Sequence, residues 1–309
     1  QLRRSDLASE RWDGVIWYSP SIFHGWVASS IKKRSGCKGY LIVRDIFPDW
    51  AVDVGIMGRG LPYWFFSSVA RYQYTVADVI GVQSPGNLRY FERWQARPKR
   101  TLEVLWNWLD KSVERRCTIR VDQTELVGRT VFVYAGNMGV AQGMDILLDL
   151  AEKLLERLDV GFILVGRGSD VGRLKSLAKD RKLVNMLFFD EIHPDEVSDL
   201  YAQCSAGIVA LDPRHRSHNI PGKFLTYMRS GLPVLANVNA GNDLARMIRE
   251  HQVGQVSERN DVEDLLQCAI KLLAQIESDG QIRSRCRSVF ERNFAVKNAA
   301  RQVISALSL

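Results

Sequence analysis

Cysteine is scarce in this sequence, and the cysteines form no recognisable framework. The 309 residues include five cysteines, an odd number, with no CxxC pair and no cluster of cysteine with histidine. Neither a disulfide framework nor a zinc site is therefore indicated, and we expect a reducing, cytoplasmic setting. The five are Cys37, Cys117, Cys204, Cys268 and Cys286.

Long apolar runs are also missing. The printed sequence has no stretch of 18 or more apolar residues and no segment with the pattern of a signal peptide. We therefore expect neither a membrane-spanning helix nor export. What is present is ordinary for a globular protein, with 46% hydrophobic and 25% charged residues and a length that fits two domains.

The net charge of +7 is concentrated in the first part of the chain. Residues 1–128 hold 19 Lys and Arg against 13 Asp and Glu, whereas residues 129–309 hold 23 against 22. A basic, tryptophan-rich half could meet nucleic acid, an anionic membrane face or a phosphorylated substrate, although we expect most individual tryptophans to be core. All eight tryptophans lie there, at positions 12, 17, 26, 50, 64, 94, 106 and 108.

The chain alternates short apolar strands with helices, which is typical of parallel sheets covered on both faces. Residues 1–110 are predicted to form one Rossmann-like domain, 111–128 a polar linker, and 129–309 a second Rossmann-like domain, with the last helix a candidate to pack back on the first. The predicted strands are 15–18, 40–43, 79–82, 102–105, 130–135, 160–165, 184–189, 206–211 and 233–236. The predicted helices are 21–33, 63–76, 143–158, one ending near 181, one from 194, 221–228, 261–275 with an Asn260–Glu263 capping box, and two more at the end.

Residues 217–237, SHNIPGKFLTYMRSGLPVLAN, carry the clearest chemistry. Pro221 and Gly222 begin a helix whose first N–H groups have no partner inside the helix, and Lys223 adds a positive charge at the same end. That combination is an anion site. The alternative is a capped helix with a solvated lysine, ended by Gly231.

Two glycine-rich loops follow strands of the second domain. In AGNMGVAQGMD, residues 135–145, Gly136, Gly139 and Gly143 would let backbone N–H groups approach a phosphate, or would simply form a tight turn. GRGSD, residues 166–170, could be a second wall of a pocket, although Asp170 capping the next helix explains it better. After a third strand, main-chain groups of residues 189–196 could read a nucleobase edge.

The loop LDPRHRSHNIPGK, residues 211–223, gathers cationic and titratable side chains after another strand. Such a set suits a diphosphate. Asp212 stands alone, so no acidic cluster for Mg²⁺ is predicted, and His218 could equally be a loop histidine with no role. The side chains are those of Arg214, His215, Arg216, His218 and Lys223.

Carboxylates cluster after the second strand of the first domain, in residues 43–55. Asp45 follows the strand directly, where it could handle a hydroxyl proton or orient a sugar. Asp45 and Asp49 could instead cap local turns beside Pro48, and we favour a site role only for Asp45.

Five ordered segments resemble the retaining glycosyltransferases of family 4, and most closely the fucosamine-transferase-like members that build bacterial O-antigen and capsule. They are RDIFPDWAVDVGIM, VLWNWLD, YAGNMGVAQGMDILLDLAEKL, LVGRGSD and IPGKFLTYMRSGLPVLA. The resemblance implies a GT-B fold, in which two Rossmann-like domains face a central cleft. It also implies an acceptor-binding first domain, a second domain that binds a nucleotide-sugar, commonly a UDP-sugar, and metal-independent transfer without a cofactor.

The resemblance also assigns residues. The lysine of the family's PSK-like motif corresponds to Lys223 in PGK, and the phosphate-facing glycine loop to Gly136, Asn137 and Gly139. Many members carry glutamates where this chain has His218 and Thr226, and charged residues where it has Asn137 and Gln142. The family also begins with further strands, so we expect the first domain to lack its first strands.

The predicted function is transfer of an N-acetylated hexosamine or deoxyhexosamine onto a lipid-linked glycan, at the inner face of the plasma membrane. The predicted catalytic residues are Asp45 and Lys223, with Asn219 and Thr226 facing ribose or sugar. Alternatives are a non-catalytic nucleotide-sugar binder or scaffold, and a sugar-nucleotide 2-epimerase; nucleic acid is not an expected partner. The predicted donor-binding residues are Gly136, Asn137, Gly139, Gln142, Arg214, Arg216, His218, Asn219, Gly222, Lys223 and Thr226.

Overall fold

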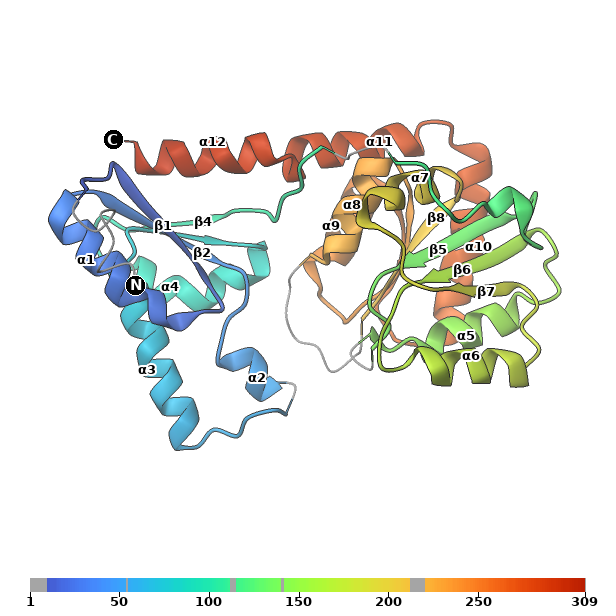
Figure 1. The fold of residues 1–309 in the computed structure, drawn as a ribbon, viewed down its shortest axis with the longest axis horizontal. Coiled ribbons are helices and arrows are strands. Elements are labelled where there is room, and N and C mark those ends of the chain that lie inside the picture. The colour runs from blue at the N-terminus through green and yellow to red at the C-terminus, as the bar shows by residue number, and fades with distance from the viewer. Residues whose placement is uncertain (1–9, 54, 112–114, 140–141, 212–219, 309) are drawn as a thin grey trace. The chain divides into compact units, whose positions relative to one another are not determined.

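The chain folds into two compact α/β units (Figure 1). The computed structural model describes residues 10–53, 55–111, 115–139, 142–211 and 220–308. Of these, residues 10–107 and 296–308 form the first unit, and residues 108–211 and 220–295 form the second. Each unit contains a parallel sheet with helices packed on it, which confirms the predicted fold class.

The sheet of the first unit has the order β1-β2-β3-β4, and every neighbouring pair is parallel. Its central strands read as continuous apolar runs because both faces are covered. On β1, Trp17 faces the core shared with α1, whereas Gly14 faces Leu307 of α12, since successive residues of a strand point to opposite faces. The strands are β1 (Gly14–Ser19), β2 (Lys38–Val43), β3 (Val79–Val82) and β4 (Thr101–Val104).

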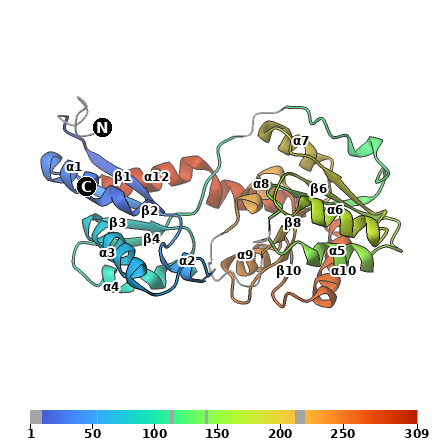
Figure 2. The same cartoon turned by 60° about the horizontal axis from the view of Figure 1, so that its bottom comes forward.

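The helices of the first unit lie on both faces of its sheet. Trp94 of α4 and Ala28 of α1 belong to one apolar core, and α1 packs along α3 (Figure 2). The last helix contacts β2, and the Gln302 side chain donates a hydrogen bond to the Val104 carbonyl at 3.0 Å. The helices are α1 (Gly25–Ser35), α2 (Asp49–Asp53), α3 (Leu61–Val76), α4 (Glu92–Gln95) and α12 (Val296–Leu307).

The expectation that most tryptophans are core is wrong for half of them. Trp17 and Trp94 are buried, at 6% and 8% exposure, and Trp106 and Trp108 are half-buried. Composition cannot separate the two groups, because exposure depends on which side of each helix meets the sheet. The exposed ones are Trp12, Trp26, Trp50 and Trp64.

The sheet of the second unit has the order β10-β9-β8-β5-β6-β7, again parallel throughout. The chain builds outward from β5 to β7 and then returns to the other side of β5 with β8. This reversal creates a crevice at the carboxyl ends of β5 and β8, where ligands bind in open α/β sheets. The strands are β5 (Thr130–Ala135), β6 (Val160–Val165), β7 (Met186–Phe189), β8 (Ala206–Ala210), β9 (Val234–Asn237) and β10 (Gly254–Ser257).

Helices cover both faces of the second sheet as well (Figures 1 and 2). On β8, Ile208 packs in the core shared with α5, α6 and α10, whereas Gly207 faces Tyr227 of α8 on the other side. α8 in turn contacts α7 and α11. The helices are α5 (Asp145–Lys153), α6 (Val171–Asp180), α7 (Val197–Ala202), α8 (Gly222–Ser230), α9 (Asp243–His251), α10 (Val262–Ser278) and α11 (Ile282–Val289).

Helix boundaries correct three details of the sequence prediction. The helix predicted over residues 143–158 is α5, which ends at Lys153 before a turn held by Arg157 and Asp159. α10 is capped by Asp261, whose carboxylate accepts from the Asp264 N–H at 2.9 Å, so the Asn260–Glu263 capping box is wrong. α9 and β10 were not predicted. β10 was missed because its sequence, GQVS, is polar and lacks apolar alternation.

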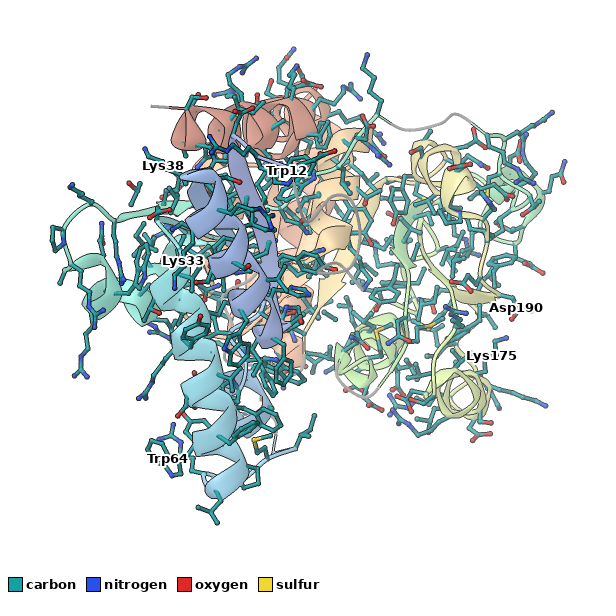
Figure 3. The ribbon with its side chains drawn as sticks, turned by 60° about the vertical axis from the view of Figure 1, so that its left-hand side comes forward. Trp12, Lys33, Lys38, Trp64, Lys175 and Asp190 are labelled. Atoms are coloured by element: carbon teal, nitrogen blue, oxygen red, sulfur yellow. The ribbon has the colours of Figure 1, made fainter. Side chains whose placement is uncertain are left out.

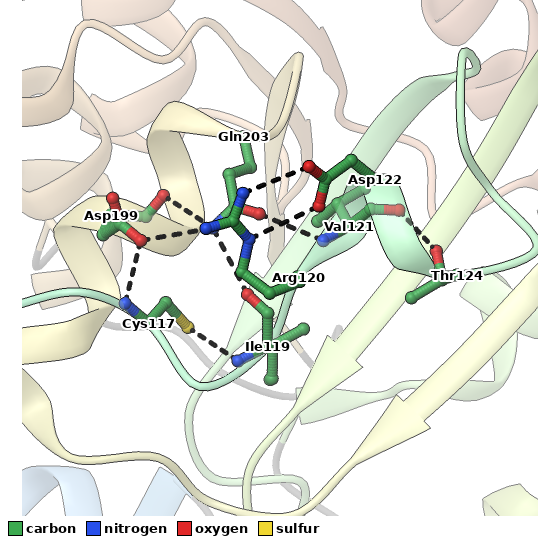
Figure 4. Close-up of polar contacts among 8 residues, drawn as sticks. All are labelled: Cys117, Ile119, Arg120, Val121, Asp122, Thr124, Asp199 and Gln203. Atoms are coloured by element: carbon green, nitrogen blue, oxygen red, sulfur yellow. Dashed lines mark hydrogen bonds and ion pairs between the residues drawn. The ribbon is translucent and has the colours of Figure 1, made fainter.

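The segment predicted to be a linker is fastened to α7 (Figure 4). The Asp199 carboxylate accepts from the Cys117 N–H at 2.8 Å, and the Gln203 side chain accepts from the Val121 N–H at 3.0 Å. Glu196 accepts from both the N–H and the hydroxyl of Thr118, at 2.9 and 2.8 Å. Side chains in and beside α7 thus satisfy backbone donors of a segment that has no sheet of its own.

No helix in the described ranges combines the length and the apolarity that crossing a bilayer requires.

The Glu196 contacts predict a pH-dependent stability. The two hydrogen bonds from Thr118 hold the pKa of Glu196 below its ordinary value of 4.5. The ionised carboxylate therefore stabilises the folded state fully above pH 4.5, and this stabilisation is lost as the pH falls through the lowered pKa. Glu196→Gln should therefore lower the thermal unfolding midpoint at pH 7, and the difference from wild type should shrink below about pH 4.5. Exposed Glu125→Gln is the control; a wild-type advantage that stays constant down to pH 3.5 contradicts the assignment.

Candidate functional site

A pocket of about 320 Å³ lies within the second unit, at the carboxyl ends of three neighbouring strands. Its walls come from the loops after β5, β6 and β7 and from one side of α8. That is the edge of the sheet at which parallel α/β domains bind ligands. The residues that line it are Leu109, Ala135, Gly136, Val165, Gly166, Glu191, Ile192, Pro194, Val197, Tyr201, Lys223, Thr226 and Arg229.

The floor of the pocket depends on backbone-to-backbone contact between two loops. A Cβ on Gly166 would lie 2.0 Å from the Gly136 carbonyl oxygen, and a Cβ on Gly168 would lie 2.1 Å from the Met138 oxygen. Both glycines also have positive φ, of 143° and 154°. Only glycine allows this approach. The loops after β5 and β6 are consequently held together as one surface by the hydrogen bond from the Met138 N–H to the Arg167 carbonyl at 2.7 Å.

Lys223 stands at the start of α8 and reaches over this floor. A Cβ on Gly136 would lie 2.9 Å from the Lys223 Cε, so the lysine occupies the space above the glycine. Pro221, with extended backbone, precedes the first turn, and Gly231 ends the helix at φ 70°. The early N–H groups of α8 and the lysine charge therefore lie at one end of the helix, as the sequence predicts.

The Lys223 ammonium is held in a partly apolar environment. Its Nζ lies 4.5 Å from the centre of the Tyr134 ring, and burial lowers the pKa of Lys223 from 10.5 to about 8. No carboxylate in the described part of the chain forms an ion pair with it. An unpaired cation that is costly to bury is stabilised by an incoming anion, which restores the charged form.

Two further side chains share this face of α8. Thr226 and Arg229 follow Lys223 at intervals of three, so all three project to the same side. The Thr226 hydroxyl donates to the Gly222 carbonyl at 3.2 Å, and Arg229 donates from Nη1 to the Asp110 carbonyl at 2.8 Å. The buried Arg229 Nε has no hydrogen-bond partner in the described structure, and burial lowers the pKa of the guanidinium. The sequence analysis missed Arg229, although the three-residue spacing could have revealed it.

The other predicted loop residues lie beside the pocket and bond to one another. The Gln142 side-chain oxygen accepts from the Gly139 N–H at 3.0 Å and from the Asn137 amide at 3.3 Å. Gln142 thereby occupies the N–H group that was expected to face a phosphate. A phosphate at Gly139 would have to displace the Gln142 side chain. Gly222 faces open space, and a Cβ there would meet no atom within 4 Å.

The turn GRGSD contributes Gly166 to the pocket, and Asp170 occupies the predicted N-cap position of α6. Its carboxylate makes no capping hydrogen bond and instead accepts from Arg173, at 2.7 and 2.6 Å. In the loop after β7, Glu191, Ile192 and Pro194 line the pocket. A base-reading role of their main chain stays a prediction.

Asp45 and Asp49 do not line this pocket. Asp45 belongs to the first unit, where partial removal from water raises the pKa of its carboxyl and nearby Arg44 opposes the shift. Asp49 accepts from the Tyr63 hydroxyl at 2.9 Å. The basic loop lies outside the described residues, and with it the predicted Arg214, Arg216, His218 and Asn219.

Within the described ranges, no group of three or more His, Cys, Asp or Glu side chains could hold a metal ion. Lys223 and Arg229 are the cationic side chains of the described pocket wall.

Two parallel α/β units with a ligand-sized pocket at a strand edge define the GT-B fold. The fold matches that of Anabaena Alr3699/HepE, solved in complex with UDP and glucose, at a TM-score of 0.69 and 16% identity over 95% of this chain and 78% of that one. It also matches WaaG, a glycosyltransferase involved in lipopolysaccharide biosynthesis, at a TM-score of 0.61 and 16% identity over 92% of this chain and 81% of that one.

Residues 129–275, in the second unit, match the family model described as "Glycosyl transferases group 1". The chain is 25% identical over 73% of its length to the probable glycosyltransferase WbjE of Pseudomonas aeruginosa, of which it spans 57%. It is 22% identical over 97% of its length to the putative colanic acid biosynthesis glycosyl transferase WcaI of Escherichia coli, of which it spans 75%. The second unit is therefore similar to the group 1 glycosyl transferases over residues 129–275.

Burial of Lys223 predicts that this residue reduces stability. Because its pKa is lower in the folded chain than in the unfolded one, the unfolded state binds more protons between about pH 8 and 10.5, and the cost is greatest below that window. Lys223→Met should be more stable than wild type by about 1–3 kcal/mol at pH 7. The gap should close as the pH rises from 8 to 10.5, as measured by urea unfolding.

The matched control is Lys175→Met. Lys175 is exposed and lies 3.5 Å from the exposed Asp190 (Figure 3), a surface ion pair of little expected worth. A Lys223→Met protein that is less stable than wild type at pH 7 contradicts the burial argument.

Proposed function

We propose that this chain is the two-domain catalytic part of a retaining glycosyltransferase that transfers a sugar from a UDP-sugar to a lipid-linked glycan. The donor sugar proposed is an N-acetylated hexosamine or deoxyhexosamine, as in the fucosamine-transferase-like members of family 4. The product belongs to a cell-surface polysaccharide. The observation that carries the proposal is Lys223, a half-buried cation over the glycine floor of the pocket, with no ion-pair partner among the described residues.

The charge of the donor diphosphate explains why such a lysine is useful. When the bond between the sugar C1 and the diphosphate oxygen breaks, negative charge grows on the diphosphate, and a cation held away from water stabilises it strongly. In our proposal Lys223 and Arg229 supply that charge, and transfer needs no metal or cofactor. Thr226 faces the ribose or sugar, and the main chain near Ile192 faces the base.

The acceptor half of the reaction falls to the first unit. A new bond forms between the sugar C1 and the acceptor oxygen as the bond to the diphosphate breaks, and the proton of the acceptor hydroxyl passes to the departing diphosphate oxygen. Asp45 is the proposed group that orients the acceptor hydroxyl or the donor sugar, and its raised pKa favours holding a proton. The excess of basic residues before position 129 and the exposed tryptophans of the first unit support an acceptor presented at the inner face of the plasma membrane.

The relatives support this proposal by their described activities. WbjE is a probable glycosyltransferase, and WcaI is assigned to colanic acid biosynthesis. The HepE structures contain UDP, and one contains UDP-glucose. A nucleotide-sugar is therefore the donor class that we propose for this chain.

Removal of the Lys223 charge should weaken donor binding. Lys223→Ala should lower the affinity of the 309-residue chain for UDP and UDP-sugars by about 10- to 100-fold, as expected for one charged hydrogen-bonded contact. Lys175→Ala should leave the affinity within about twofold. Titration calorimetry gives the constants, and thermal shifts with UDP, GDP and their sugars rank the bases.

Three outcomes decide between the alternatives. Unchanged UDP affinity in Lys223→Ala contradicts the diphosphate assignment. A stabilising shift with GDP but not UDP contradicts the UDP part alone. UDP-sugar binding without sugar hydrolysis or transfer, in a protein that includes every segment of its relatives, favours the non-catalytic binder.

A further inference from the structure

The first unit contains a second pocket, of about 480 Å³, along one side of α3. It lies between α3 and α4, which are neighbours in both ribbon views (Figures 1 and 2), and the loop after β2 closes its other side. The proposed transfer reaction assigns it no role. Its lining combines aromatic rings with arginines, and guanidinium groups both stack on aromatic faces and bind phosphate oxygens.

Local contacts fix the walls of this pocket. The Trp94 indole N–H donates to the Tyr74 carbonyl at 2.7 Å, and the rings of Tyr74 and Phe91 meet edge to face at 5.0 Å. Arg100 lies over the Trp94 ring at 4.9 Å and donates to the Thr75 carbonyl at 3.3 Å. The end of α3 and the beginning of β4 are thereby joined across the pocket.

The pocket carries a strong excess of positive charge. Four guanidinium groups line it against a single carboxylate, that of Asp49. Arg71, Arg93 and Arg97 form no side-chain hydrogen bond or ion pair with any residue that the structure describes. Burial and the neighbouring Arg97 together lower the pKa of Arg100, while Asp78 opposes the shift. Guanidinium groups that line one pocket repel one another, and a shared anion relieves the repulsion.

Charge and apolar surface separate along the pocket. Tyr63 and Thr75 mark its two ends on α3, about 18 Å apart at the rise of an α-helix. The arginines gather at the Thr75 end. At the Tyr63 end, the Phe47 ring contacts exposed Trp50 at 6.3 Å, and Tyr63 contacts Trp64 at 5.4 Å, which Figure 3 labels on α3. Asp49 receives the Tyr63 hydroxyl there and would repel an anion from that end.

We propose that this pocket binds an amphiphilic phosphate, with the phosphate or diphosphate among Arg71, Arg93, Arg97 and Arg100 and the apolar chain along Phe47 and Tyr63. Arginine forks match phosphate oxygens, and the aromatic end suits an alkyl or isoprenoid segment. Both a membrane lipid and a free phosphorylated amphiphile have this chemistry. The proposal concerns binding by the first unit and does not require sugar transfer.

The test uses the 309-residue chain with three soluble probes: farnesyl diphosphate, inorganic pyrophosphate and farnesol. All titrations are repeated in a Lys223→Ala background, which removes the diphosphate contact proposed for the second unit. Farnesyl diphosphate should bind at least about tenfold more tightly than either other probe, since each of these has only half of the recognised chemistry. Flotation with phosphatidylcholine vesicles, with and without phosphatidic acid, distinguishes a lipid from a free ligand.

Arg93→Gln/Arg97→Gln should weaken farnesyl diphosphate binding at least about tenfold, because two exposed guanidinium contacts are lost. Arg93→Lys/Arg97→Lys should recover part of the affinity. The charge-matched control is Lys33→Gln/Arg34→Gln on the exposed end of α1, which should stay within about twofold. All four positions are exposed, so thermal unfolding should change little.

Four results would overturn the proposal. Equal affinity for pyrophosphate and farnesyl diphosphate would contradict recognition of the apolar chain. Binding of farnesol as tight as that of farnesyl diphosphate would contradict recognition of the phosphate. Farnesyl diphosphate binding that is lost in Lys223→Ala alone assigns the ligand to the second unit. Equal losses in the Arg93/Arg97 and Lys33/Arg34 variants show attraction by net charge without a site.

Discussion

A positive charge held away from water, at Lys223, is the constraint around which the second unit's pocket is arranged. The charge is tolerable because Tyr134 offers its ring and because the first turn of α8 places the lysine at a pocket open to ligand. Gly136 has a φ of 143°, which favours glycine, and the lysine lies over the space that a side chain there would enter. Gly166 must be glycine because the Gly136 carbonyl lies against it, and this contact brings the loops after β5 and β6 into one surface. The environment of Lys223 therefore depends on two loops and on the start of α8.

Two partly buried cations lower the stability of the folded state at the pocket, and the packing around the pocket offsets this cost. Arg229 keeps a buried Nε without a hydrogen-bond partner in the described structure, and Lys223 keeps a lowered pKa. The opposite face of the sheet is a continuous apolar core from β5 to α10. Ion pairs beyond the pocket, such as the half-buried pair of Arg181 with Asp149, join neighbouring helices. Sites for anions commonly combine a stable frame with a local region that an anion would stabilise further.

The sequence predicted most of the fold because parallel strands buried on both faces are continuous apolar runs. β5, β6 and β8 were placed almost to the residue for that reason. β10 escaped because it is polar, and Asn260 was mistaken for a cap because Asn and Asp are adjacent and both suit that role. The anion end of α8 was predicted from local rules alone, since helix starts and lysines are local features. Which side chains surround Lys223 depends on packing, so the Tyr134 ring under its ammonium and the Tyr201 side chain in the pocket lining could not be found from spacing.

The arginine pocket of the first unit shows the same limit more clearly. Arg93, Arg97 and Arg100 are close in sequence, but Arg71 and the aromatic wall come from α3 and the loop after β2. Composition showed that this half of the chain is basic, but it could not show where on the fold the charges lie. It also led to the prediction of mostly buried tryptophans, several of which are exposed. The decisive fact is tertiary: α3 and α4 meet so that three arginines without partners in the described structure share one cavity with aromatic rings. Because these arginines line one pocket, a single anion there contacts several guanidinium groups at once, which scattered surface charges do not allow.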